Sequence, residues 1–309
     1  MTGMLAWFLS LVLFPPEERE MSERFAPPGF AGNYWGPEAA EAREEGKLPP
    51  IVMTPHMARW DRWARHVLRD GDIVFRMGDA RLLHGYFPMS RFLANCSNSP
   101  FSHTGIIAFE KDGPVVYDTT RPAVARQPFC VWVLDNVGNI GVKRLRPEYR
   151  DAIPRVVAYC RKVYQEQVPF DYELGLDDSA LYCIEMTVKA FKAAGIELCK
   201  PIQLGDMERA AEFPLCMFGL RAASRRNLEH PLDFDSLVYF PGNDRHGIWS
   251  ARQLMTVVAP TYSPGYPELS NGVMPKSLVP SEPGERRTEK VSNPSQPPHQ
   301  GHAVRHQGA

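Results

Sequence analysis

The sequence predicts an α+β domain in which a small antiparallel sheet or half-barrel packs on helices. Two observations favour this class. Between residues 70 and 145, short runs rich in β-branched and aromatic residues alternate with turn signals such as Asp70-Gly71-Asp72 and Asp112-Gly113, as expected for consecutive antiparallel strands. Beyond residue 150, apolar residues recur every three or four positions, which is typical of helices that cover one face of a sheet.

The expected elements follow in chain order. Thr54 and Pro55 supply a helix cap and a first-turn proline, so a helix should run from there to about Arg69. The expected strands cover residues 73–76, 101–109, 114–118, 129–134 and 140–145. Two further helices are expected at 150–167 and 179–194, and Gly195 takes the position after the C-terminus of the second.

The folded body is expected at residues 51–262, because the two ends differ from it in composition. Residues 1–50 contain an apolar N-terminal segment and then an arm of mixed charge, Pro and Gly that predicts irregular structure. Residues 263–309 are rich in Pro, Ser and Gly with almost no large apolar side chains, which predicts a disordered tail. Residues 196–262 have enough apolar side chains to join the same core or to form a cap over a site.

The apolar segment at residues 4–14 is open to two interpretations. It is shorter than the roughly 20 residues that a membrane-spanning helix needs. Its length suits a signal peptide, but no Lys or Arg precedes it and no small-residue cleavage site follows. It is either an export signal or membrane anchor, or an apolar segment that docks on the protein or lies peripherally at a membrane surface. The compartment, cytoplasmic or exported, therefore stays open.

The composition excludes several classes of function. The 35 Lys and Arg residues are balanced by 36 Asp and Glu residues, so nothing favours a nucleic-acid partner. The six Cys residues form no Cys-x-x-Cys or Cys/His pattern, so no zinc or other metal site is expected. No Walker or Rossmann glycine pattern is present, and no organic cofactor is expected.

Cys183 is the leading candidate for a catalytic residue. It falls in the first or second turn of the helix expected after Asp178. A helix N-terminus carries a partial positive charge and free N–H groups, which favour a nucleophilic thiolate. Small residues share its helix face, whereas Glu185 and Lys189 are expected on the opposite side, where Glu185 would be either a solvated residue or a structural partner. The alternative is that Cys183 is one more buried core thiol.

His103 is the expected partner, and Asp118 could orient it. His103 lies near the start of a strand, and Asp118 ends the next strand. An even-numbered hairpin loop places the two on one face of the sheet, and the register in which Asp118 faces Gly105 brings it within diagonal reach of His103. A carboxylate there would hold the imidazole in one orientation, as in catalytic triads.

Together these residues resemble the permuted papain-like amidases, the YiiX-like members of the NlpC-type cysteine peptidase superfamily. The matching segments lie between Asp70 and Gly195 and comprise Gly71 to Arg76, Ser102 to Ala108, Val115 to Asp118, Phe170 to Tyr172 and Leu181 to Glu185. The order of His before Cys is what the permutation implies. Two positions depart from the family pattern, since Asp118 replaces an expected Glu and Ile184 replaces an expected Ser.

The resemblance implies the permuted papain-like/NlpC-type fold and a role for each site residue. Cys183 would be the nucleophile, His103 the general base and then acid, and Asp118 the residue that orients His103. The backbone N–H of Cys183 is a candidate oxyanion donor, and Tyr182 would add a wall or a hydroxyl donor. The mechanism needs no cofactor.

Two functions are compatible with this pattern. In the first, the protein is a thiol-dependent hydrolase or acyltransferase that cleaves an amide or ester, and the resemblance suggests a cell-wall peptide or a lipid-linked acyl group as substrate. In the second, it is a non-catalytic module on the same fold that binds an acyl or peptide ligand. The replacements at 118 and 184 are the main support for the second.

Overall fold

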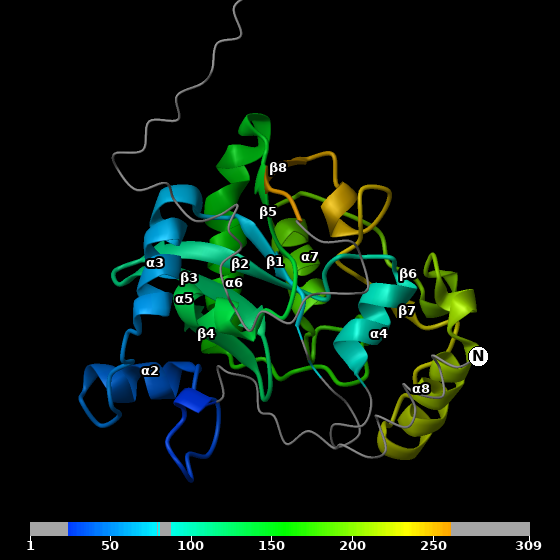
Figure 1. The fold of residues 1–309 in the computed structure, drawn as a ribbon, viewed down its shortest axis with the longest axis horizontal. Coiled ribbons are helices and arrows are strands. Elements are labelled where there is room, and N and C mark those ends of the chain that lie inside the picture. Colours follow the sequence, from blue (N-terminus) through cyan, green and yellow to red (C-terminus); the bar gives the residue numbers. More distant parts are fainter. Residues whose placement is uncertain (1–23, 79, 81–87, 261–309) are drawn as a thin grey trace, which may run out of the picture.

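A six-stranded antiparallel sheet forms the centre of the molecule (Figure 1). The structure is a computed structural model that describes residues 24–78, 80 and 88–260. The strands, in the order in which they lie side by side, are β4 (Val124–Pro128), β3 (Gly113–Thr119), β2 (His103–Glu110), β1 (Ile73–Arg76), β5 (Ile140–Leu145) and β8 (Leu254–Val258). The α+β class and the antiparallel sheet are therefore confirmed.

Helices cover both faces of this sheet (Figure 1). One face carries α6 (Ile153–Gln165) and α7 (Cys183–Ala193), and the other carries α3 (Pro55–Val67) and α5 (Phe129–Trp132). Successive strand residues point to opposite faces, so Ile73 and Phe75 join the first apolar core while Val74 joins the second. The two cores bury the sheet on both sides.

A smaller lobe adds a separate apolar cluster beside the main sheet. It contains α4 (Met89–Cys96), α8 (Pro214–Asn227) and the two-stranded sheet of β6 (Ile202–Gln203) and β7 (Leu237–Val238). The short 3-10 helices are η2 (Val133–Asp135), η3 (Pro147–Ala152), η4 (Leu204–Asp206), η5 (Ala210–Glu212) and η6 (Ile248–Ser250). Within residues 196–260, β8 extends the main sheet, as one of the two expectations required, and much of the rest builds this lobe.

Most predicted elements are present. Thr54 caps α3 through a hydrogen bond from the Met57 N–H to its Oγ1 (3.2 Å). Gly195 has a φ of 85° after the end of α7, as expected for a helix-terminating glycine. The predicted strand at 129–134 is wrong, because these residues form α5 and η2. Every residue of this run is buried, and an apolar run without a polar face has no periodicity that separates strand from helix.

The N-terminal arm also differs from the expected irregular segment. Pro37–Glu44 form helix α2, and Tyr34 and Trp35 are buried in the core that contains α3. These aromatic side chains fix the arm to the body. The apolar run at 4–14 and the tail at 263–309 lie outside the described residues. Among the residues that are described, no helix has the length and apolar character needed to cross a membrane.

Candidate active site

Cys183 is the first residue of α7, which starts later than predicted. Tyr182 precedes it in an extended conformation, so the Cys183 N–H belongs to the first turn, whose N–H groups have no partner within the helix. Thr104 of β2 fastens this turn to the sheet, since its Oγ1 donates to the Cys183 carbonyl (3.3 Å) and lies 2.9 Å from Thr187 Oγ1. Only 8% of the Cys183 surface is exposed. The sulfur therefore lies where a helix end meets the start of a strand.

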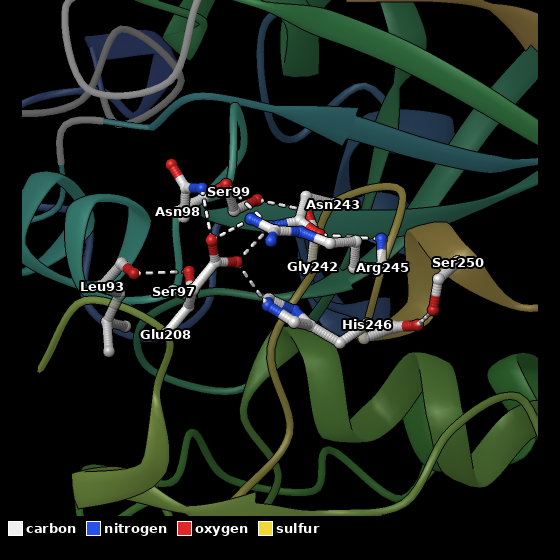
Figure 2. A network of polar contacts seen from close by, with 11 residues as sticks. Leu93, Ser97, Asn98, Ser99, Glu208, Gly242, Asn243, Arg245, His246 and Ser250 are labelled. Atoms are coloured by element: carbon white, nitrogen blue, oxygen red, sulfur yellow. Dashed lines mark hydrogen bonds and ion pairs between the residues drawn. The ribbon is translucent and has the colours of Figure 1, made fainter.

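His103 begins β2, and a polar network holds the segment that leads to it (Figure 2). Ser99 Oγ accepts from the Phe101 N–H (3.1 Å) and donates to the Gly242 carbonyl (2.6 Å). Asn243 Nδ2 donates to the Asn98 carbonyl (3.1 Å) and to Glu208 Oε2 (3.1 Å). The loop at 242–246 thereby fixes the approach to β2 from outside the sheet.

Asp118 reaches His103 from β3. Ile106 pairs with Tyr117 in the hairpin, and continuing this register places Asp118 opposite Gly105, as one of the predicted registers required. A Cβ atom at Gly105 would lie 2.3 Å from Val116 Cγ1 and 3.3 Å from Asp118 Cβ, so the close approach requires glycine. Asp118 Oδ2 lies 2.7 Å from His103 Nε2. The Asp side chain, shorter than the expected Glu, is therefore long enough.

His103 connects Asp118 to Cys183. The imidazole is also close enough to Cys183 to interact with it electrostatically. Because Nε2 faces Asp118, Nδ1 is the ring nitrogen left for the sulfur. Burial opposes the charged imidazolium, but the interaction with Cys183 and the hydrogen bond that Asp118 accepts outweigh burial and the nearby Arg76, raising the pKa of His103 to about 9. The arrangement favours the imidazolium form of His103.

Trp132 and Arg76 complete this cluster, and sequence reasoning missed both. Trp132 Nε1 donates to Asp118 Oδ2 (2.7 Å), and its ring centroid lies 5.9 Å from that of His103. The Arg76 guanidinium lies 4.4 Å from the centre of the Trp132 ring. A charged residue within the short apolar strand 73–76 was a usable signal, since a buried Arg needs partners. No such signal marks Trp132, because the apolar run around it is compatible with a strand.

Tyr182 and Glu185, which lie close to Cys183 in the sequence, each have polar partners of their own. The Tyr182 hydroxyl accepts from the Tyr239 N–H (2.6 Å) and donates to the Tyr239 carbonyl (3.4 Å), so it is engaged with that loop. Of the two expectations for Glu185, the structural one holds and the solvated one does not, because its side chain is fully buried 2.9 Å from Lys189 Nζ. Burial raises the pKa of Glu185 to about 7, although Lys189 partly offsets this.

The six cysteines are all free. Burial raises the pKa of Cys96 and Cys199 to about 12 and that of Cys130 to about 11. It also raises the pKa values of Cys160 and Cys216. A thiolate is disfavoured at all five positions, which makes them a natural reference for the reactivity of Cys183.

Comparisons with known proteins agree with this geometry. A family model described as permuted papain-like amidase enzyme, YaeF/YiiX, C92 family, matches residues 67–226, a range that contains Cys183, His103 and Asp118. The uncharacterized protein YiiX of Escherichia coli (strain K12) is 22% identical over 188 residues, which cover 60% of this chain and 84% of that protein.

A crystal structure of the metalloprotein yiiX from Escherichia coli O157:H7 is similar in fold. The TM-score is 0.50 at 21% sequence identity, and the match covers 63% of this chain and 99% of the other. In the described part of the present chain, no group of three or more His, Cys, Asp or Glu side chains could hold a metal ion, so these residues do not fit such a site.

Proposed function

Because this chain belongs to the permuted papain-like amidase family C92, a cysteine peptidase-like family, we propose that it is a thiol-dependent hydrolase or acyltransferase that cleaves an amide or ester bond. One observation carries the proposal: His103 contacts Asp118 and also interacts with Cys183, the first residue of α7. A peptide amide or a lipid-linked acyl group supplies the carbonyl that such a site would attack.

The proposed first half-reaction transfers the acyl group to sulfur. The Cys183 thiolate attacks the carbonyl carbon, the C–S bond forms, and the carbonyl π electrons move to oxygen. The backbone N–H of Cys183 is the proposed donor to that oxyanion, since the Tyr182 hydroxyl is engaged with Tyr239. The intermediate then collapses, and the His103 imidazolium gives its proton to the leaving amine or alkoxide.

The second half-reaction releases the acyl group. Neutral His103 takes a proton from water, or from an acceptor alcohol or amine, as that nucleophile attacks the thioester. Collapse of the second intermediate breaks the C–S bond and restores the thiolate beside the imidazolium. Hydrolysis and acyl transfer differ only in the nucleophile used here. Asp118 holds His103 in the orientation that both proton transfers require.

A non-catalytic binding module remains the second candidate function. Its main support from the sequence was the pair of replacements at 118 and 184. Asp118 makes the contact with His103 that a longer Glu was expected to make, which weakens this support. The low exposure of the Cys183 side chain still favours the binding module.

Covalent labelling separates the two functions. The wild-type protein is incubated at neutral pH with a thiol-reactive acyl probe, and adducts are located by intact mass and peptide mapping. If the protein is a thiol-dependent enzyme, Cys183 should be acylated much faster than Cys96, Cys130 and Cys199. Equal, slow labelling of all cysteines would favour the binding module. Candidate amide and ester substrates are then compared between wild type and Cys183→Ala.

A further inference from the structure

The carboxylate of Asp118 is held asymmetrically. His103 Nε2 and Trp132 Nε1 both lie 2.7 Å from the same oxygen, Oδ2. The other oxygen, Oδ1, is buried and has no hydrogen-bond partner within the described part of the chain. Because nothing there holds Oδ1, the two donors on Oδ2 decide how the carboxylate is rotated.

Trp132 is itself fixed from several directions. Arg76 Nη1 donates to the Trp132 carbonyl, and the same guanidinium lies over the Trp132 ring. Arg76 also pairs with Asp135, at 3.3 Å from its Oδ2, and so fastens η2 to β1. Phe129, at the other end of α5, stacks on the Trp132 ring, and the two ring centroids lie 6.2 Å apart. The indole N–H is therefore presented to Asp118 by a buried, rigid support.

Arg76 stands next to His103 on the sheet. The two residues are direct partners in the β1–β2 register, and their side chains therefore share a face. The charged or titratable groups that face the imidazole are thus Arg76 from β1, Asp118 from β3 and Cys183 from α7. Among these, Asp118 is the group whose position depends on Trp132.

We infer that Trp132 is a positioning residue for the proposed nucleophile pair, acting through Asp118 Oδ2 to hold the His103 ring toward Cys183. This inference rests on the proposed function for the role of His103 in catalysis. The effect of Trp132 on the orientation of His103 can be measured without a substrate. Trp132 does not touch the reacting atoms. Its effect passes entirely through the carboxylate.

The test uses Trp132→Phe, which keeps an aromatic ring and removes the N–H donor. Trp249→Phe is the matched control, because Trp249 Nε1 also donates to a carboxylate, Asp244 Oδ1 at 3.0 Å, in the loop that follows β7. NMR of isotope-labelled histidine side chains follows the titration of His103, assigned with His103→Gln. Thermal unfolding is recorded for each variant, and iodoacetamide labelling of Cys183 is measured by mass.

Of the two tryptophan variants, only Trp132→Phe should shift the pKa of His103. Loss of the fixed carboxylate orientation should lower the pKa of His103 by about one unit, and Asp118→Asn should lower it by about two. Trp249→Phe should leave it unchanged even where it lowers the melting temperature as much. In the Asp118→Asn background, Trp132→Phe should add almost nothing, because the group through which it acts has been neutralised.

Two outcomes would overturn the inference. One is a His103 titration that moves no more in Trp132→Phe than in Trp249→Phe, and the other is an effect of Trp132→Phe that adds fully to that of Asp118→Asn. If Trp132→Phe does not fold, benzothienylalanine at position 132 keeps the ring size without the N–H and gives the same test. Slow labelling of wild-type Cys183 would count against the proposed function and leave the His103 titration as a separate result.

Discussion

Asp118 of β3 and Glu185 of α7 are both fully buried carboxylates, and their surroundings differ. On the sheet side, Asp118 receives hydrogen bonds from a titratable imidazole and from a fixed indole. On the helix side, Glu185 pairs with Lys189, which also contacts Asp178 at 2.7 Å and the Asp177 carbonyl. Asp118 thus faces the imidazole of the proposed site, whereas Glu185 pairs with a lysine that ties α7 to the loop before it. Burial alone therefore does not distinguish the two carboxylates, whereas their partners do.

The largest effect should come from Cys183, the proposed nucleophile. Cys183→Ala should remove the acyl adduct and lower turnover of any cleaved substrate by at least about 10³-fold, because no thiolate is left to attack the carbonyl. Intact-mass spectrometry and initial rates check this, with Cys199→Ala as the control. An acyl adduct that persists in Cys183→Ala would place the nucleophile elsewhere.

Neutralising each carboxylate compares the two sides directly. Asp118→Asn should lower kcat/KM by about 10²-fold, because the imidazolium loses its anionic partner. Glu185→Gln should stay within about threefold of wild type, since no proton transfer uses that group. Steady-state rates at pH 7 measure both variants. Equal losses would mean that Glu185 also takes part in the chemistry.

The pH dependence of the rate should report His103. Its pKa is raised from 6.5 to about 9, so the imidazolium is fully present below 6.5 and is lost as pH rises through about 9. The rate of leaving-group protonation should then fall by about tenfold per pH unit above that value. A profile of kcat/KM against pH locates this limb. A limb near 6.5 instead would show that Asp118 and Cys183 do not stabilise the imidazolium.

Glu185 should affect stability instead. Its pKa is raised from 4.5 to about 7, so the buried protonated form contributes stability fully below 4.5, and this contribution is lost as pH rises through about 7. The contribution amounts to about 3 kcal/mol at most. Urea unfolding of wild type and Glu185→Gln across this range should give a flatter pH dependence for the variant. Parallel curves would contradict the assignment.

A third carboxylate, Glu208 at the surface, should have the smallest effect. It pairs with Arg245 and lies 2.8 Å from His246 Nε2 in the network that holds the approach to β2 (Figure 2). Glu208→Gln should cost about 0.5–1 kcal/mol of unfolding free energy, because exposed ion pairs contribute little. Urea unfolding measures this loss. A change in the His103 titration of Glu208→Gln would show that the network also positions the imidazole.

Strands β1, β2, β3 and β5 and the residues of the candidate site were predictable from the sequence because their signals are local, whereas β4 and β8 were not predicted. β-branched residues and turn signals located β2 and β3, but the turn near Asp112-Gly113 left two registers open. The pairing of Glu110 with Gly113 belongs to the register in which Asp118 faces Gly105. The start of a helix near Cys183 could be inferred from the preceding acidic turn and the following apolar residues. These features depend on neighbours in the chain, and each has a periodicity or a turn signature.

The parts that escaped prediction depend on contacts between distant segments. Trp132 meets Asp118 only because Arg76 fastens η2 to β1, and nothing within the run at 129–134 encodes that contact. The position of Glu185 on the polar face of its helix left a solvated and a structural role open, and only the folded chain shows that its side chain is fully buried. Contacts between distant segments that bury polar groups leave no periodic pattern in the sequence, so local patterns do not predict them.

Thr104 and His103 are neighbours on β2, and their side chains point to opposite faces of the sheet. Thr104 anchors the nucleophile helix on one side, while His103 meets its acid on the other. A single inserted or deleted residue in the β2–β3 turn would shift the acid out of line with the imidazole by one pleat. We therefore expect that this turn tolerates changes of residue type far better than changes of length.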